Sequence, residues 1–485
     1  MEILIPDIRL IVPELIIIGT AMVVLMVDVF VRQRLTSMIL AIFGLILAFQ
    51  YTRTLPFPVP ATSFYDMVLV DKYAVFFKYI FYVSLGFTIF ISAKYKAIET
   101  VPSGEYFSLL LLATSGMMLM VSSVDLVVIY LGLEVMALSL YVLAGINRQD
   151  LRANEAAMKY LLLGGFSSAI LLYGIALVYG MTETTNLREI ARALADTNLT
   201  ENPILLLGLI FLIVAFAFKV ALVPFHMWSP DVYEGAPTSV TAFMSVGPKA
   251  AGFAVMGRVL IEAFGRDATG SIELQASWLS VLWVLAIITM VFGNVVAIAQ
   301  RNIKRMLAYS SIAHAGYILL GIIVATPQGL SSTMTYLMIY AFMNIGAFSI
   351  VIFLNREGMA GENLDDYKGL AKTHPFFAFL MLIFMFSLSG IPPTAGFMGK
   401  FYLFMETVRA GYTYLVIIAL IFSAVSAYYY LRVVMYMYME EPVTEIQGVA
   451  SIPLYAVMAC AAILVLLIGI YPTGLLDFAK AAVGI

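Results

Sequence analysis

Long apolar blocks separated by short polar connections run through the whole chain. A run of about 18 or more apolar residues with few charges is typical of a transmembrane helix. Fourteen such blocks can be marked, at residues 10–31, 37–55, 68–92, 105–122, 124–146, 156–180, 203–231, 238–264, 278–299, 306–326, 334–354, 375–408, 412–438 and 452–471. Lipid cannot satisfy backbone polar groups, and the blocks lack the alternation of barrel strands, so helices are the assignment that fits. The pattern predicts an all-α polytopic membrane protein with about 14 transmembrane helices.

Two of these blocks contain prolines that should break their helices. The seventh block, 203–231, contains Pro224, and the twelfth, 375–408, contains Pro392 and Pro393. Proline inside a helix removes a hydrogen bond and clashes with the preceding turn. At membrane depth such a break is tolerated only where the freed backbone is buried in protein or faces a wet cavity.

The two breaks lie at corresponding places in two units of five blocks each, blocks 4–8 and 9–13. An odd number of helices inverts the second unit relative to the first, and inverted repeats with matching broken helices are typical of transporters. We therefore expect four segments. They are the first three helices (residues 1–104), the first repeat (105–264), the second, inverted repeat (265–440) and a last helix (441–485).

The basic residues of the connections suggest an orientation. Connections after odd-numbered blocks carry the larger share of Lys and Arg, and cytoplasmic loops carry such an excess. The beginning of the chain lacks the basic region of a cleaved signal peptide, so we expect the first helix to stay in the mature protein. This predicts a multi-pass protein of the bacterial inner membrane with both termini on the periplasmic side.

Composition excludes several classes of function. The chain is 62% hydrophobic and 12% charged, whereas a soluble domain carries roughly 25% charged residues. A net charge of −3 gives no basic face for nucleic acid. The single cysteine excludes a disulfide framework, an iron–sulfur ligand set and a cysteine-rich zinc site. No nucleotide-binding glycine motif lies between a strand and a helix, so we expect neither a cofactor nor a metal site in this chain.

Four ionisable residues inside the blocks are the main candidates for function. Glu134 lies in the middle of block 124–146 and Lys249 in the middle of block 238–264, while Lys219 precedes the first break and Lys400 follows the second. Each costs roughly 2.5–3.5 kcal/mol on insertion. Burial disfavours the charged form of a lysine and a nearby carboxylate favours it. A Lys–Glu pair of variable separation could thus hold and release a proton, and the alternative is a static ion pair between helices.

Three further residues are weaker candidates. Lys159 lies near the start of block 156–180, where it could also be a helix-end lysine that reaches the membrane surface. His314 lies within block 306–326 and could also be a satisfied core histidine. Lys304 belongs to the basic turn 301–305, and its position alone favours a topology charge.

Two other polar segments have a structural interpretation. His226, Asp231 and Glu234 follow the first proline, and we expect them to cap and hydrate the second half-helix rather than to bind a ligand. The tyrosine-rich run 428–438 is interpreted as an interfacial belt with some packing.

Three segments carry a resemblance to a known family. PFHMWSPDVYEGAPTSVTAF (224–243), RNIKRMLAYSSIAH (301–314) and SGIPPTAGFMGKFYLF (389–404) resemble the antiporter-like subunits of respiratory complex I, and the resemblance spans essentially the whole chain. It implies a fourteen-helix fold with inverted repeats and a proton-translocating role in an NADH:quinone oxidoreductase. The M-type member of the family usually has a glutamate in place of Lys400. The L-type member continues into a long lateral helix, whereas this chain stops about 14 residues after the last block.

The resemblance also implies roles for individual residues. The family's relay residues carry over by motif to Glu134, Lys219, Lys249, Lys304 and Lys400, with Lys159 matching a further family lysine and His314 completing the candidate set. The implied path is a hydrated half-channel from the cytoplasm to Lys219, lateral transfer through Lys249 and exit by way of Lys400. Glu134 would tune Lys219 and face a neighbouring subunit.

Cofactors and partners follow from the same resemblance. FMN, the iron–sulfur clusters and quinone would be bound by other subunits. The partners would be the lipid bilayer and the membrane subunits of types A, H, J, K, L and M, and nucleic acid would not be one. Two alternatives stay open, namely a subunit of an Mrp-type cation/proton antiporter and a scaffold that anchors neighbours without moving protons.

Overall fold

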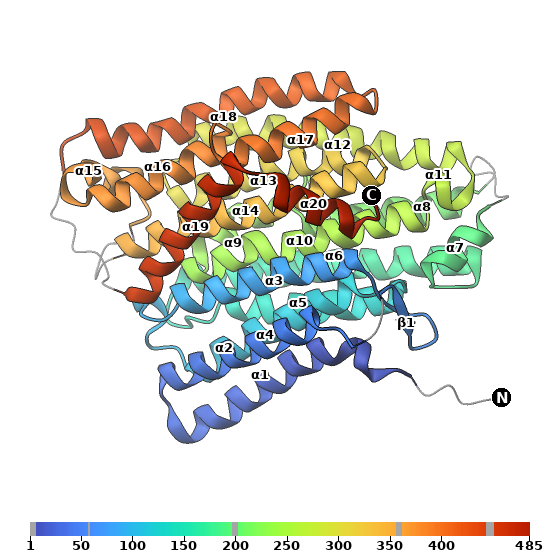
Figure 1. The fold of residues 1–485 in the computed structure, drawn as a ribbon, viewed down its shortest axis with the longest axis horizontal. Helices are drawn as coiled ribbons and strands as arrows, with labels where there is room; N and C mark the ends of the chain where they lie inside the picture. Colours follow the sequence, from blue (N-terminus) through green and yellow to red (C-terminus); the bar gives the residue numbers. More distant parts are fainter. Residues whose placement is uncertain (1–5, 57–58, 196–201, 356–360, 443–450) are drawn as a thin grey trace.

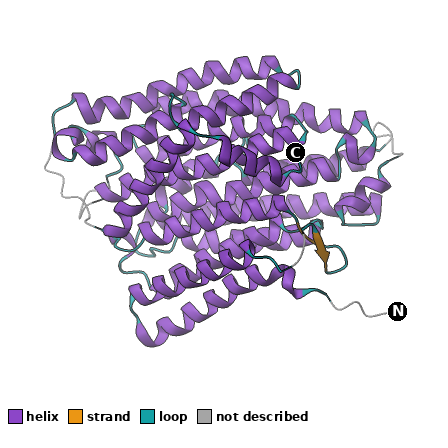
Figure 2. Cartoon of the chain, in the orientation of Figure 1, coloured by secondary structure: helices purple, strands orange, loops and turns teal. Residues whose placement is uncertain are grey.

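Long helices lie side by side across the whole molecule (Figure 1). The computed structural model describes residues 6–56, 59–195, 202–355, 361–442 and 451–485. Within these ranges the only sheet is a small antiparallel hairpin at one end of the helices (Figure 2). The all-α membrane fold expected from the apolar blocks is confirmed.

The element boundaries follow the apolar blocks closely. The long helices are α1 (Val12–Val31), α2 (Arg34–Arg53), α3 (Lys72–Ile91), α4 (Ser103–Val121), α5 (Leu126–Ala144), α6 (Leu151–Thr182), α10 (Thr238–Glu262), α12 (Ile272–Ala299), α13 (Ile303–Ile323), α14 (Pro327–Leu354), α18 (Thr413–Met439) and α19 (Ile452–Ile470). The shorter helices are α7 (Leu187–Ala193), α8 (Pro203–Lys219), α9 (Trp228–Gly235), α11 (Arg266–Thr269), α15 (Leu370–Thr373), α16 (Pro375–Ser389), α17 (Ala395–Arg409) and α20 (Thr473–Ala482). Short 3-10 helices cover Ile8–Ile11, Lys96–Ile98 and Leu364–Tyr367. The strands are β1 (Ala61–Ser63) and β2 (Val68–Val70).

The hairpin is the main departure from the predicted blocks. The third block was expected to begin at residue 68, but Val68–Val70 forms β2 and α3 begins at Lys72. The side chain of Asp71 accepts a hydrogen bond from the backbone nitrogen of Ala74 at 2.7 Å and thereby caps the helix. The apolar run therefore continues across a strand and a helix, and hydropathy alone could not separate them.

Both predicted helix breaks are confirmed. In the first, α8 ends at Lys219 and α9 begins at Trp228, and in the second, α16 ends at Ser389 and α17 begins at Ala395. The freed backbone groups find partners inside the protein, as burial requires. The nitrogen of Val223 donates to Thr289 Oγ1 at 3.0 Å, and the nitrogen of Gly396 donates to Ser387 Oγ at 3.0 Å.

The number of described helices that are long and apolar enough to cross a membrane is smaller than the fourteen spans expected. In the part of the chain that the structure describes, 11 helices are long and apolar enough to cross a membrane by length and composition. Of the expected spans, the seventh and twelfth are shortened by their breaks, which leaves α8 and α16 with 17 and 15 residues. The eighth, α10, is long enough but rich in Gly, Ser and Thr. Fourteen spans therefore stay a prediction.

Glycines let two pairs of helices touch at the backbone. A side chain at Gly116 of α4 would overlap the carbonyl oxygen of Gly132 in α5, and the reverse substitution would overlap α4. Gly293 of α12 and Gly316 of α13 approach the facing backbone in the same way. These are the first helix pairs of the two predicted five-helix units, so the two units begin with the same kind of close packing.

The centre of the molecule is formed by α13 and α14. The apolar windows of these helices are 94% and 100% buried, whereas those of α1 and α18 are 33% buried. Figure 1 shows α1 and α2 at one edge and α18 at the opposite edge. Polar residues on α13 and α14 are therefore held deep inside the protein, where each one needs a partner.

Candidate functional site

Lys219 is buried without a polar partner. It is the last residue of α8, and only 5% of it is exposed. Among the described residues, no hydrogen-bond acceptor meets its Nζ atom. The Nζ atom lies 5.8 Å from the ring centre of Tyr141 and 6.0 Å from that of Phe218. These cation–π contacts offset part of the cost of burying the ammonium group, but they do not replace a hydrogen bond.

Glu134 acts on Lys219 from a distance. It is half-buried on α5 and accepts a hydrogen bond from the Ser168 hydroxyl of α6. Its charge interacts with Lys219, yet no ion pair within 4.0 Å joins the two side chains in the described structure. The two charges of the expected pair are therefore close enough to interact, although their side chains do not touch.

Lys249 is tied to the buried helix α13. Its Nζ atom donates to the Ser311 carbonyl oxygen at 3.1 Å and also to the Ser311 hydroxyl. The same atom lies 5.8 Å from the ring centre of Tyr233 in α9. Lys249 thus connects α10, α9 and α13 at the middle of the protein.

His314 lies three residues beyond Ser311 on the same helix. Its Nδ1 atom is 2.6 Å from the Tyr336 hydroxyl, and its Nε2 atom is 3.1 Å from the Tyr430 hydroxyl. Both ring nitrogens therefore have partners, and one of the two tyrosines must accept while the other donates, depending on the tautomer.

The tyrosines of α18 contradict part of the sequence interpretation. Tyr429 and Tyr430 belong to the run interpreted as an interfacial belt, but both are fully buried. The Tyr429 hydroxyl donates to Asn294 Oδ1 at 3.0 Å. For these two residues the belt interpretation was wrong, because α18 turns this face toward α12 and α13.

Lys400 holds the second break together. Its Nζ atom donates to the carbonyl oxygens of Leu388 and Ser389 at 3.2 and 2.9 Å and to Ser423 Oγ at 2.9 Å. It lies 5.1 Å from the ring centre of Tyr317. A groove of about 460 Å³ between α17 and α18 reaches Lys400 and is lined mainly by apolar side chains, among them Phe397, Phe401 and Phe404.

One face of α13 joins Lys249 to Lys400. Ser311, His314 and Tyr317 follow one another at intervals of three residues, so each lies about one turn from the next along the helix. Ser311 meets Lys249 and Tyr317 meets Lys400. Sequence reasoning found His314 and missed the two hydroxyl residues, although their helical spacing from the histidine was a usable signal.

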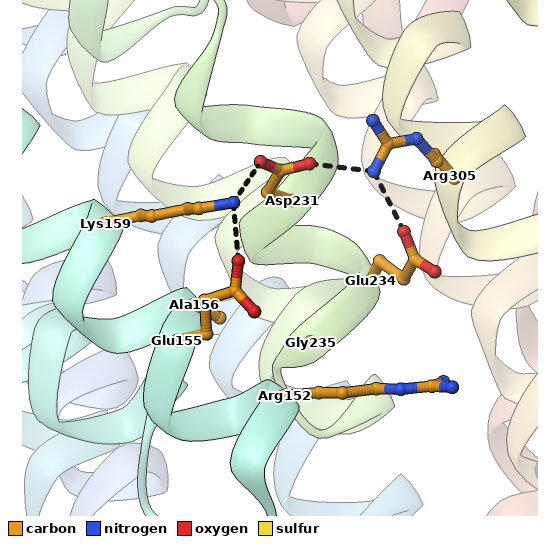
Figure 3. Close-up of a pocket in the computed structure, with 8 residues that line it drawn as sticks. All are labelled: Arg152, Glu155, Ala156, Lys159, Asp231, Glu234, Gly235 and Arg305. Atoms are coloured by element: carbon orange, nitrogen blue, oxygen red, sulfur yellow. Dashed lines mark hydrogen bonds and ion pairs between the residues drawn. The ribbon is translucent and has the colours of Figure 1, made fainter.

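Lys159 belongs to a different cluster, shown in Figure 3. Its Nζ atom pairs with Glu155 and Asp231, each at 2.7 Å. Arg305 of α13 pairs with the other oxygen of Asp231 at 2.8 Å and with Glu234 at 2.9 Å. These charges line a pocket of about 280 Å³. Asp231 and Glu234 were expected to cap and hydrate a half-helix; instead Asp231 pairs with both α6 and α13, and Glu234 pairs with α13.

The position-based interpretation of Lys304 as a topology charge is wrong. The residue is buried, and its Nζ atom donates to the carbonyl oxygens of Glu234 and Ala236 at 2.6 and 2.8 Å. It also pairs with Glu362 at 3.1 Å. Lys304 therefore fastens the end of α9 to the start of α13. His226, by contrast, is buried with its ring 4.8 Å from that of Phe292.

Sequence reasoning also missed a buried ion pair among the first three helices. Lys78 of α3 and Glu14 of α1 are joined at 2.7 Å, with side chains 1% and 5% exposed. Ser122 approaches the same carboxylate oxygen at 3.5 Å. The signal was available, because both charges fall inside apolar blocks. Within the described ranges, no three His, Cys, Asp or Glu side chains are grouped as a metal would need.

Comparison with known proteins supplies an independent view of this chain. Residues 123–427 match the family described as NADH:quinone oxidoreductase/Mrp antiporter, TM. A Trichlorobacter lovleyi protein named NADH-quinone oxidoreductase subunit N is 46% identical over 482 residues, which covers 98% of this chain and 97% of that protein. A Rhizobium meliloti protein named NADH-quinone oxidoreductase subunit N 2 is 45% identical over 470 residues, covering 97% and 96%.

Solved structures show the same fold in more than one kind of complex. A chain of respiratory complex I from Thermus thermophilus with bound aureothin matches with a TM-score of 0.78 and 31% identity, covering 96% of this chain and 99% of that one. A chain of the Mrp complex from Dietzia sp. DQ12-45-1b matches with a TM-score of 0.83 at 22% identity, covering 98% and 96%. The second likeness is one of fold alone.

Proposed function

Because this chain belongs to the family of NADH-quinone oxidoreductase subunit N, we propose that it translocates protons in the membrane arm of such an oxidoreductase, respiratory complex I. Electrons would pass from NADH to quinone in other subunits, which would carry FMN and the iron–sulfur clusters. This chain would contribute no redox group. Its part would be to move protons through buried lysine and glutamate side chains.

The observation that carries the proposal is the buried row that runs from Lys249 to Lys400 along α13. Ionisable groups deep in a membrane protein are expensive and mark ion or proton pathways. In this row Ser311 accepts from Lys249, and the Tyr317 ring lies beside Lys400. His314 lies between them, and its two ring nitrogens meet the hydroxyls of Tyr336 and Tyr430. A static tie between helices would need one ion pair, whereas this row contains no carboxylate partner for either lysine among the described residues.

The proposed path begins at the first break and ends at the second. Lys219 would receive a proton from a hydrated half-channel and Glu134 would set how firmly it is held. Lateral transfer would pass through Lys249 and His314, and Lys400 would release the proton on the other side.

Lys159 and Lys304 complete the proposed set around α9. An ion pair from Lys159 ties α9 to α6, and hydrogen bonds from Lys304 to carbonyl oxygens at the end of α9 tie it to α13. A change in the charge of either lysine would alter how α9 sits over the break. We therefore place both residues in control of access to Lys219.

The proposed surroundings follow from the relatives. The chain is a multi-pass membrane protein, and its neighbours would be subunits of types A, H, J, K, L and M in a bacterial inner membrane, with both termini on the periplasmic side. Two inverted five-helix units, residues 105–264 and 265–440, would be related by a pseudo-two-fold axis in the membrane plane. The matching glycine contacts of α4–α5 and α12–α13 support this relation.

An Mrp-type antiporter subunit is the second candidate, because the fold match to the Dietzia Mrp complex covers 98% of this chain. Purification of the native complex and identification of its other subunits separates the two. Companion subunits that bind NADH and quinone support the first function, and antiporter subunits alone support the second.

The relay itself is tested in the assembled complex reconstituted into vesicles. Lys249→Met should leave assembly intact and abolish proton uptake linked to quinone reduction, because methionine fills the site and carries no proton. Lys480→Met is the matched control, since Lys480 is exposed on α20. Normal proton uptake in the Lys249 variant would leave only the scaffold interpretation standing.

A further inference from the structure

The proposed path lacks a connection between Lys219 and Lys249, because the row along α13 begins only at Lys249. Four aromatic rings fill this gap. Tyr141 packs edge-on against Tyr160 at 4.7 Å, Tyr160 stacks on Trp228 at 4.5 Å, and Trp228 meets Tyr233 at 6.2 Å. The two lysines stand at the ends of this series, each with its Nζ atom 5.8 Å from the terminal ring centre, Tyr141 for Lys219 and Tyr233 for Lys249.

Two serine hydroxyls lie near the end of this aromatic series that is next to Lys249. The neighbours of the fully buried Tyr233 phenol include the hydroxyls of Ser229 and Ser311. Ser229 precedes Tyr233 by four residues in α9, so both lie on one face of that helix just beyond the break. Ser311 is the residue to which Lys249 donates. Among the described residues, neither the Tyr233 hydroxyl nor the Ser229 hydroxyl has a hydrogen-bond partner, so the phenol O–H is free to turn toward either serine.

Trp228 fixes where this phenol sits. Its indole nitrogen donates to the Phe218 carbonyl oxygen at 2.9 Å, which joins the start of α9 to the end of α8 beside Lys219. Its ring stacks on Tyr160, lies 5.6 Å from the Phe218 ring and meets Tyr233 edge-on. Trp228 is thus a positioning residue, and the hydroxyl of Tyr233 is the group that can both donate and accept a proton.

We propose that the Tyr233 hydroxyl passes the proton between the Lys219 side and Lys249, across an aromatic partition formed by Tyr141, Tyr160 and Trp228. This inference rests on the proposed function and names the link that it lacks. In the step, the Lys219 ammonium releases a proton that reaches the phenol oxygen by way of the Ser229 hydroxyl, and the phenol's own O–H proton leaves by way of the Ser311 hydroxyl to neutral Lys249. Lys219 is left as a neutral amine. The phenol is O–H before and after, Lys249 becomes an ammonium, and rotation of the hydroxyls restores the starting arrangement.

The aromatic partition should limit the back-flow of protons along the proposed path. Packed rings exclude a continuous file of water, which would conduct protons freely in both directions. A single rotating hydroxyl conducts only when the lysines on its two sides are in the right charge states. The arrangement therefore connects the first break to the centre of the protein and still limits back-flow.

Tyr233→Phe tests the inference in the purified complex, reconstituted into vesicles. Phenylalanine keeps the ring against Trp228 and the cation–π contact with Lys249, and it removes only the hydroxyl. We expect unchanged assembly and a loss of coupled proton uptake of at least about tenfold, in line with the loss of a proton-transferring group. Tyr82→Phe is the matched control, because Tyr82 is a buried phenol with one hydrogen bond, to Thr52 at 2.9 Å, among the first three helices.

Two additional variants separate relay from packing. Ser229→Ala should lower uptake in the same direction, and the double variant with Tyr233→Phe should lose no more than Tyr233→Phe alone, because both act on one step. Trp228→Phe keeps every hydroxyl and should cost less than Tyr233→Phe. Additive losses, or a larger effect at Trp228, would assign a packing role to Tyr233 and overturn the inference.

The outcome also distinguishes this inference from the function on which it rests. Normal uptake in Tyr233→Phe together with lost uptake in Lys249→Met would reject Tyr233 and leave the relay function intact. Normal uptake in both variants would reject the function itself. Activity is normalised to the amount of this subunit in each complex, so a variant that assembles poorly is still measured.

Discussion

The two broken helices solve the burial of a lysine in opposite ways. Lys219 ends the first half-helix and meets no polar acceptor among the described residues. Lys400 lies in the second half-helix of its pair and donates back to two carbonyl oxygens at the end of the first half, and to Ser423. Lys219 lies at its break but donates no hydrogen bond to the backbone groups there, among the described residues. The second lysine caps the break.

Two lysines at corresponding helix breaks therefore differ in what they contribute to stability. The carbonyl oxygens at the end of α16 would lack an intrahelical partner, and a cation at a helix C-terminus is favourable. Lys400 therefore contributes to folding as well as to any proton transfer. Lys219 also lies at a helix C-terminus, the end of α8, but among the described residues it donates no hydrogen bond to the break. The remaining cost of its burial is explained by a functional requirement.

Lys219→Ala should produce the largest effect on activity. The complex should assemble, because no hydrogen bond is lost, while coupled proton uptake falls by about a hundredfold, since alanine cannot carry a proton. Proton uptake into vesicles and NADH oxidation are measured together with subunit content. Uptake at the parental level would show that the first break plays no part in the relay.

Replacing both lysines by methionine sharpens the comparison through stability. Lys400→Met leaves two carbonyl oxygens without a donor and should lower the free energy of unfolding by about 1–3 kcal/mol. Lys219→Met removes an unpartnered charge and should be neutral or stabilising. Thermal denaturation of the purified complex compares the two variants, and equal losses would contradict the distinction between the breaks.

Glu134→Gln should act only through Lys219. The two charges interact without contact, which corresponds to about 1–2 kcal/mol and a loss of about five- to thirtyfold in coupled uptake. Combined with Lys219→Ala, the glutamine should have no additional effect. Losses that add in full would mean that Glu134 has a separate role, for example toward a neighbouring subunit.

Two serine substitutions should give the smallest effects. Ser423→Ala removes one of three acceptors from Lys400, and Ser168→Ala removes the hydrogen bond to Glu134. Each should change uptake by about threefold, within the range of one hydrogen bond. Only Ser423→Ala should also lower the denaturation temperature, because only the second break depends on its lysine for stability. An equal loss of stability in Ser168→Ala would contradict the claim that only the second break depends on its lysine for stability.

The sequence predicted the helices and the lysines for one physical reason. Apolar runs and the charges that interrupt them stand out against lipid, so the blocks, both proline breaks and the buried Lys219, Lys249 and Lys400 could be read directly. His314 was found in the same way. Its partners were not, because a hydroxyl costs little inside a membrane helix and gives no signal on its own.

Burial by distant segments could not be predicted from position along the chain. Lys304 lies in a basic turn, which suggested an exposed charge. It is buried because the end of α9, 68 to 70 residues earlier in the chain, and Glu362, 58 residues later, close over it. Glu14 and Lys78 both lie inside apolar blocks, which was a usable signal, but only the folded arrangement of α1 and α3 shows that the two charges pair with each other.

The close backbone contacts of α4–α5 and α12–α13 have a consequence for how the protein is made. In each pair the two helices are neighbours along the chain, joined by a few residues, and no side chain separates them at the glycines. Contacts between sequence neighbours form early, because little chain entropy is lost in closing a short loop. Each hairpin can thus associate as soon as its second helix leaves the insertion machinery. The half-helix α9 also needs α13 for its contacts with Lys304 and Arg305, and Lys400 of α17 needs Ser423 of α18. The polar contacts at the two breaks should therefore be completed only after these later helices are inserted.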